Sequence, residues 1–308
     1  MKKLFVISLA LLACSCMDRK EAGSELDELS WGAAGLYIEN PIAPGEELCY
    51  QISFSLDTLA GESELAKQLA VVLRDSVLRV TGYTTVSESM IACADSMERG
   101  WKAELAEMYE PDSEFRETLQ YYYTIEGSSV ENGREDVLSS QTALDCSLGG
   151  AHGSYVVQYF NFDKSSGRLI CIGDIVPADK EMLVLKAMEE QLCKEWDAKD
   201  LADLQEKTGI TMLGDLYLTN NFLIKSDSIE FLFNQYEIAP YAAGLISVTV
   251  ERPYISPLGR LRGVFTNRFA PTLHPCTRKY SGSLRSSRSC RRHSSEQTWR
   301  HRRSIRDS

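Results

Sequence analysis

Apolar residues alternate with polar ones along several stretches of the chain, a period that predicts half-buried β-strands. The alternation is clearest over residues 48–59, where every second side chain from Leu48 to Leu56 is apolar. Further strands are predicted at residues 120–125, 155–162, 169–172, 222–224, 229–233 and 245–250. Asn132-Gly133 and the segment 163–167 carry turn residues between these strands, as hairpins do.

Elsewhere apolar residues recur every three or four positions, which is typical of one face of a helix. This spacing predicts helices over residues 62–80, 87–108 and 179–196. The inner face expected for the last of them consists of Met182, Leu185, Met188, Leu192 and Trp196. Because helices and strands are segregated along the chain, the pattern predicts an α+β fold in which antiparallel sheets pack with a few helices.

The N-terminus has the pattern of a secretory signal. Lys2 and Lys3 precede an apolar run over residues 4–13, which is shorter than the ~20 residues that span a bilayer. The run ends in the sequence LLACSC, which resembles a bacterial lipobox, in which a cysteine takes a diacylglycerol. We therefore expect a lipoprotein signal and lipobox over residues 1–16.

Two cysteines compete for the lipid. Cys14 has Leu11 three positions before it and Ala13 directly before it, whereas Cys16 has Ala13 and Ser15 at these positions. The larger residue three positions before the cysteine favours Cys14 as the lipidated residue, and Cys16 remains the alternative. The chain is thus expected to be exported and anchored by lipid to the cytoplasmic or the outer membrane, with residues 17–44 as a polar tether.

The charge is divided unevenly along the chain. The net charge is −11, but residues 257–308 carry +11 and the remainder −22. An acidic body repels phosphate backbones, so nucleic acid is not an expected partner, while a cationic partner would suit it.

The tail over residues 257–308 differs from the body in composition. It holds twelve Arg and one Lys, against eight Arg and twelve Lys before it. It is predicted to be disordered, either as a basic arm or as the product of a reading-frame shift near residues 252–260. The abrupt change in arginine usage favours the shift.

Few residues offer catalytic or metal-binding chemistry. His152 is the one histidine before the tail, and a hydrolase would have to combine it with Ser154 and Asp174. No nucleophile elbow surrounds Ser154, and neither the histidine count nor the cysteine spacing fits a metal site. No catalytic residue, metal or cofactor is therefore expected.

Three segments together resemble one family. They are GGAHG at residues 149–153 with the following strand and turn, the helix at 179–196, and IEFLFNQYEIAPYAAGLISVTV at 229–250. These resemble the RsiV-like domain, a family of unknown function that includes a lysozyme-sensing anti-sigma factor and accessory domains of peptidoglycan deacetylases. The resemblance covers residues 140–256, and residues 45–139 resemble the N-terminal PdaC/RsiV-like domain that accompanies it.

The resemblance implies two small tandem subdomains and a binding surface rather than an active site. The implied motif residues are Gly149, Gly150, His152, Asp174, Tyr236, Glu237, Pro240 and Tyr241. It implies a non-catalytic envelope lipoprotein that binds a lysozyme-like basic protein or the glycan of peptidoglycan. The alternative is a peptidoglycan-modifying enzyme or its accessory subunit.

From the residues alone, two motif positions have a structural explanation. Asp174 follows a strand and precedes Pro177, where its carboxylate can accept backbone N–H groups. Pro240 lacks a donor, so the segment around it is not expected to continue the preceding strand.

Overall fold

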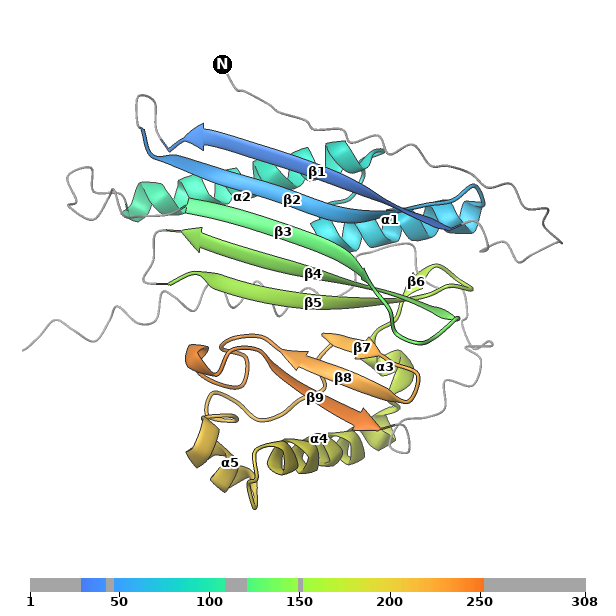
Figure 1. The fold of residues 1–308 in the computed structure, drawn as a ribbon, viewed down its shortest axis with the longest axis vertical. Helices are drawn as coiled ribbons and strands as arrows, with labels where there is room; N and C mark the ends of the chain where they lie inside the picture. Colours follow the sequence, from blue (N-terminus) through green and yellow to red (C-terminus); the bar gives the residue numbers. More distant parts are fainter. Residues whose placement is uncertain (1–28, 43–46, 109–120, 149–151, 252–308) are drawn as a thin grey trace, which may run out of the picture. The chain divides into compact units, whose positions relative to one another are not determined.

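The computed structural model describes residues 29–42, 47–108, 121–148 and 152–251, and it confirms the α+β class. A six-stranded sheet has the order β1-β2-β3-β4-β5-β6, and a three-stranded sheet has the order β7-β8-β9 (Figure 1). The larger sheet consists of β1 (Ser30–Pro41), β2 (Cys49–Ala60), β3 (Tyr121–Val130), β4 (Val137–Leu148), β5 (Ser154–Asp163) and β6 (Arg168–Leu169). The smaller consists of β7 (Phe222–Ile224), β8 (Ser228–Phe233) and β9 (Ile246–Glu251).

The helices lie where the apolar spacing predicted them, with two short ones added. They are α1 (Glu64–Leu78), α2 (Val86–Met108), α3 (Ile172–Ile175), α4 (Glu181–Glu195) and α5 (Leu201–Thr208), with 3-10 turns η2 (Ala178–Lys180) and η3 (Tyr241–Ala243). Within the described ranges, no helix is long and apolar enough to cross a membrane.

Several expectations fall on other parts of the chain. Cys14, Cys16, Gly149, Gly150 and the tail over residues 257–308 lie outside the described residues.

One pairing in the larger sheet is parallel. β2 and β3 run in the same direction, from the Tyr50–Tyr121 pair to the Leu56–Gly127 pair. Parallel neighbours need a long crossover, and α1 and α2 supply it while covering one face of the sheet (Figure 1). The expectation of antiparallel sheets is therefore wrong for this pair and right for all the others described.

The tether expected over residues 17–44 is wrong for its second half, because residues 30–41 form β1. Leu36 and Ile38 are buried against α2 and the sheet and pair with Phe54 and Ile52 of β2. In the sequence, the apolar alternation around Leu36 and Ile38 is short and follows the small residues GAAG. The segment therefore resembles part of a polar linker.

The boundary expected between residues 139 and 140 falls inside β4. β4 pairs with β3 on one side and β5 on the other, so one sheet continues across the position. The boundary was expected because the two halves resemble two different domains. The hydrogen bonds of β4 to both neighbours show that no domain boundary lies at this position.

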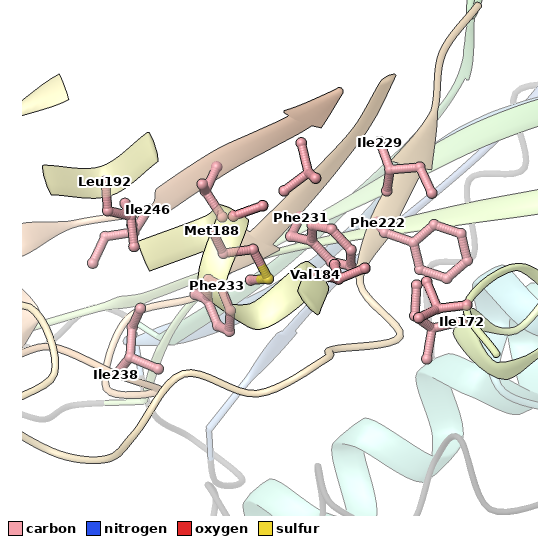
Figure 2. Packing of buried hydrophobic residues seen from close by; sticks show 14 of the residues in the cluster. Ile172, Val184, Met188, Leu192, Phe222, Ile229, Phe231, Phe233, Ile238 and Ile246 are labelled. Carbon is pink, nitrogen blue, oxygen red and sulfur yellow. The ribbon is translucent and has the colours of Figure 1, made fainter. Parts of the chain in front are cut away.

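The smaller sheet packs against α4 to form a core of its own (Figure 2). Val184, Met188 and Leu192 follow one another at four-residue steps along α4 and are fully buried with Phe222, Phe231 and Phe233 of the sheet. Met188 and Leu192 are buried as predicted, Leu185 is partly buried, and Val184 is a core residue that the predicted face did not include.

Two members of the predicted inner face of α4 are wrong. Met182 is 75% exposed and Trp196 is 52% exposed. Met182 lies two positions before Val184, which turns it away from the buried line, and Trp196 is the residue that caps the helix end.

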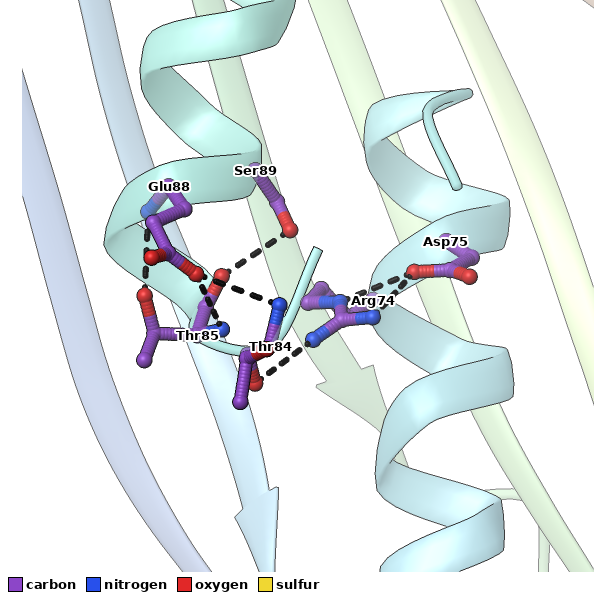
Figure 3. A network of polar contacts seen from close by, with 6 residues as sticks. All are labelled: Arg74, Asp75, Thr84, Thr85, Glu88 and Ser89. Carbon is purple, nitrogen blue, oxygen red and sulfur yellow. Dashed lines mark hydrogen bonds and ion pairs between the residues drawn. The ribbon is translucent and has the colours of Figure 1, made fainter. Parts of the chain in front are cut away.

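The turn between α1 and α2 is held by a capping box (Figure 3). The Glu88 carboxylate accepts the Thr84 and Thr85 N–H groups at 3.1 and 3.0 Å, and the Thr85 hydroxyl accepts the Glu88 N–H at 3.2 Å. Arg74 of α1 donates to the Thr84 carbonyl at 3.2 Å while it pairs with Asp75. These bonds satisfy N–H groups that the first turn of a helix leaves without partners.

Candidate functional site

The structure brings together three motif residues that are far apart in the sequence. The ring of His152 stacks on that of Tyr241 with centroids 4.1 Å apart, and the Tyr236 ring lies 6.2 Å from His152 and 5.7 Å from Tyr241. His152 precedes β5, whereas Tyr236 and Tyr241 lie in the connection between β8 and β9. We call these three residues the aromatic cluster.

Hydrogen bonds fix the orientation of His152. Its Nδ1 lies 3.0 Å from the Gly153 carbonyl, and its Nε2 lies 3.2 Å from the Tyr236 hydroxyl. A carbonyl can only accept, so Nδ1 carries a hydrogen and donates it to Gly153, while Nε2 shares a hydrogen bond with the Tyr236 hydroxyl. Both ring nitrogens are thus occupied within the protein.

Tyr236 adopts a backbone conformation that few bulky residues adopt. Its φ is 66°, in the left-handed region, which costs a non-glycine residue about 1–2 kcal/mol. The Glu237 carboxylate accepts the Asn234 N–H at 2.8 Å, and the Glu237 N–H donates to the Asn234 carbonyl at 3.1 Å. Glu237 therefore closes the turn that holds the Tyr236 side chain outward. Tyr236 is 52% exposed.

Pro240 has the role expected of it. Residues 234–245 form no strand in the structure, and Pro240 precedes η3, whose first residue is Tyr241. Gly244 ends this turn at a φ of 69°, which glycine adopts without strain. The proline and the glycine together set where Tyr241 projects.

Buried asparagines attach this connection to the larger sheet. Asn234 exchanges two hydrogen bonds with the backbone of Val157, at 2.8 and 3.1 Å. Asn221 accepts the Tyr159 N–H at 2.9 Å and donates to the Val157 carbonyl at 2.8 Å. The edge of β5 that β4 does not cover is thereby satisfied by side-chain amides, and Asn234 fixes the start of the turn that carries Tyr236.

Three further residues, which the sequence did not mark, lie on the sheet beside the aromatic cluster. The Tyr122 hydroxyl lies 3.3 Å from the Asp145 carboxylate, and Tyr155, 41% exposed, is the cross-strand partner of Asp145. Burial, followed by the negative charge of Asp145, raises the pKa of Tyr122. Tyr122 and Tyr155 lie on predicted strands, whereas no strand was predicted over Asp145, so the sequence carries no signal that marks the three residues together.

Gly153 allows the close approach of these parts. A Cβ at this position would lie 3.0 Å from the Cys146 carbonyl oxygen and 3.7 Å from the Tyr122 hydroxyl. Steric contact therefore explains why the final residue of the GGAHG motif is glycine: a side chain there would push the His152 segment away from β3 and β4.

Asp174 has a structural role outside the cluster. Its carboxylate accepts the Cys171 N–H at 2.8 Å, as expected from the sequence, and lies 3.5 Å from Arg168. The bonds of His152 and of Asp174 are made to other groups, so the Ser154–His152–Asp174 arrangement of a hydrolase is not formed. In the described part of the chain, no group of three His, Cys, Asp or Glu residues could hold a metal ion.

Comparison with known proteins places the second half of the described chain in context. Residues 174–252 match the model of a family described as protein of unknown function (DUF3298). The match begins at Asp174 and includes the turn of Tyr236 and Tyr241. No curated protein matches the chain.

Two solved structures are similar to the chain. One is a DUF3298 family member from Bacteroides fragilis, 18% identical with a TM-score of 0.63 over 72% of this chain and 90% of that one. The other is a DUF3298 family protein from Pseudomonas aeruginosa PAO1, 17% identical with a TM-score of 0.52 over 75% and 96% of the two chains. These likenesses extend across both sheets and show the fold.

Proposed function

We propose that this protein is a non-catalytic, lipid-anchored protein of the bacterial cell envelope that binds a basic protein ligand of the lysozyme type. The observation that carries the proposal is the aromatic cluster. Tyrosine is favoured where two proteins meet, because its ring supplies a large apolar surface with one polar group. The three residues come from segments that resemble the RsiV-like family, and that resemblance supports the choice of ligand.

Strain and exposure support a binding role for the cluster. Tyr236 keeps a left-handed backbone and an exposed ring, an arrangement that burial in a core does not explain. Strained residues of this kind are concentrated at functional sites.

Charge supports a basic partner. The first 256 residues carry −22, and β1 to β5 contain five acidic residues and no lysine or arginine. Such a surface attracts a cationic protein and accelerates its association.

Titration of the purified full-length chain with hen egg-white lysozyme tests the proposal. We expect binding at micromolar concentration or tighter, weakened by added salt. Tyr236→Ala should reduce the affinity about tenfold, as for an interface anchor, whereas Tyr83→Ala should not change it. Tyr83 is an exposed tyrosine in the α1–α2 connection and so controls for the loss of one surface ring.

Absence of binding at micromolar concentration would remove lysozyme as the ligand. Sedimentation with purified peptidoglycan then tests the glycan. Muropeptide profiles of a strain with His152→Ala should match those of the wild type, and altered profiles would favour a peptidoglycan-modifying enzyme instead.

A further inference from the structure

The elements that surround the aromatic cluster contain no basic residue. β3, β4 and β5 have neither lysine nor arginine, and the stretch 226–251, which includes the whole β8–β9 connection, has none. The same elements contain carboxylates, among them Asp145 of β4 and Glu237, which directly follows Tyr236. A ligand at this position therefore meets negative charge without a competing cation from these elements.

The geometry of the cluster suits a flat cation. His152 and Tyr241 stack with an angle of 24° between their planes, and Tyr236 is inclined to Tyr241 by 38°. The faces of aromatic rings carry a negative quadrupole that attracts cations. A guanidinium group is planar and weakly hydrated, so it stacks on such faces more readily than an ammonium does.

A carboxylate is placed to complete the site. The Tyr122 hydroxyl contacts Asp145 at 3.3 Å. Gly153 follows His152 directly, and a Cβ built on Gly153 would lie 3.7 Å from the same hydroxyl. Tyr122 thus links the aromatic cluster to the carboxylate. Asp145 and Tyr155 share the sheet face that Tyr122 occupies.

From this arrangement we infer that the aromatic cluster and Asp145 form a receptor for an arginine side chain of the protein partner. The inference rests on the proposed function and adds the chemical group that the site recognises. The guanidinium stacks on the aromatic cluster, and its N–H groups face the carboxylate of Asp145. An anionic ligand does not fit, because the surrounding strands offer it no cation.

The experiment uses the full-length chain and three small probes. N-acetyl-arginine amide, N-acetyl-lysine amide and N-acetyl-citrulline amide are titrated separately, and aromatic NMR signals of His152 and the tyrosines are followed. The arginine probe should give saturable shifts at millimolar concentration, and the lysine probe should bind several-fold more weakly. Citrulline has the same shape without the charge and should give no saturable shift.

Two charge-removing variants locate the site. Asp145→Asn should weaken binding of the arginine probe at least fivefold. Glu126→Gln removes the same charge from an exposed position on the same sheet face and should leave the affinity unchanged. Equal binding of citrulline, equal effects of the two variants, or no shifts with the arginine probe would each overturn the inference.

Lysozyme separates this inference from the proposed function. If lysozyme binds the wild type and the Asp145→Asn variant equally, the chain binds a basic protein but not through this receptor, and the inference is wrong. If the arginine probe binds as described and lysozyme does not, the receptor stands and the lysozyme-type ligand is wrong.

Discussion

The side-chain amide of Asn234 pairs with the backbone of Val157 as a neighbouring strand would. Its Oδ1 accepts the Val157 N–H at 2.8 Å, and its Nδ2 donates to the Val157 carbonyl at 3.1 Å. The two residues are 77 positions apart, and both are buried. The Asn234 amide, together with that of Asn221, therefore takes the place of a neighbouring strand at Val157, where the turn of Tyr236 begins.

Replacing Asn234 with alanine should lower the stability markedly. The variant leaves the buried Val157 N–H without an acceptor, which costs about 1–3 kcal/mol, and removes a second bond. We expect a loss of about 3 kcal/mol in the free energy of unfolding, measured by urea denaturation. Gln235→Ala is the control, because its amide makes only a 3.5 Å contact to Tyr155; an equal loss there would contradict the role of Asn234.

Alanine should have opposite effects at two glycines. At Gly153 the added Cβ meets the Cys146 carbonyl at 3.0 Å, and such overpacking costs about 1–3 kcal/mol. At Gly100, in α2, a Cβ meets nothing within 4 Å, so Gly100→Ala should stabilise the helix by up to about 1 kcal/mol. Thermal unfolding of both variants checks the signs, and a rise in melting temperature for Gly153→Ala would refute the close approach.

Two methionines of α4 should respond very differently to truncation. Met188 is fully buried between α4 and the smaller sheet, whereas Met182 is 75% exposed. Met188→Ala should cost about 2–5 kcal/mol through lost burial and the cavity left behind, and Met182→Ala less than about 0.5 kcal/mol. Denaturant unfolding measures both, and similar losses would mean that the buried face of α4 is misassigned.

The capping box of α2 should make stability depend on pH. Hydrogen bonds from the Thr85 backbone and hydroxyl and the Thr84 backbone lower the pKa of Glu88 below its ordinary value of 4.5. A lowered pKa in the folded state means that the ionised carboxylate stabilises the fold above pH 4.5 and that this contribution is lost as the pH falls through the lowered value. Glu88→Gln should therefore be less stable than the wild type at pH 7.

Urea unfolding from pH 7 to pH 3 tests this dependence. The stability difference between wild type and Glu88→Gln should shrink towards the acid end, and a constant difference would contradict the proposed origin. Thr85→Ala removes the reciprocal bond of the cap and should cost about 1 kcal/mol at neutral pH.

Lipid attachment is tested in cells. Labelled palmitate should be incorporated into the wild-type chain and not into a variant with both Cys14→Ser and Cys16→Ser. The two single variants show which cysteine carries the lipid, and Cys14→Ser is expected to lose the label. Unchanged labelling of the double variant would end the lipoprotein proposal.

Local periodicity predicted most elements because each depends on residues near in sequence. α1, α2, β2, β5 and β8 lie within a few residues of their predicted bounds. β1 was missed because residues 32–35 give no apolar alternation. β4 was missed because the polar residues 139–142 interrupt its apolar pattern. The parallel pairing of β2 with β3 was missed because the alternation within a strand does not show which strand it pairs with.

The site was predicted in part for a related reason. His152, Tyr236 and Tyr241 were each named from the motifs, but the contacts of His152 with the two tyrosines join residues 84 and more positions apart. Tyr122 and Asp145 were not named, because a tyrosine and an aspartate on a strand are ordinary until another segment approaches them. Asn234 was missed since asparagine at a strand end usually marks a turn, and its bond to Val157 exists only in the folded chain.

The parallel pairing of β2 with β3 also orders the events of folding. The chain is synthesised from its N-terminus, so β1 and β2 can form a hairpin early, but Tyr50 must wait for Tyr121 to emerge before β2 gains its second neighbour. Contacts of such long sequence separation form slowly. The N–H of Val157 on the edge of β5 waits longer still, until Asn234 is made. Nascent chains that stop before this residue therefore display an open strand edge, which favours aggregation, and the aromatic cluster assembles only when nearly all of the described chain is present.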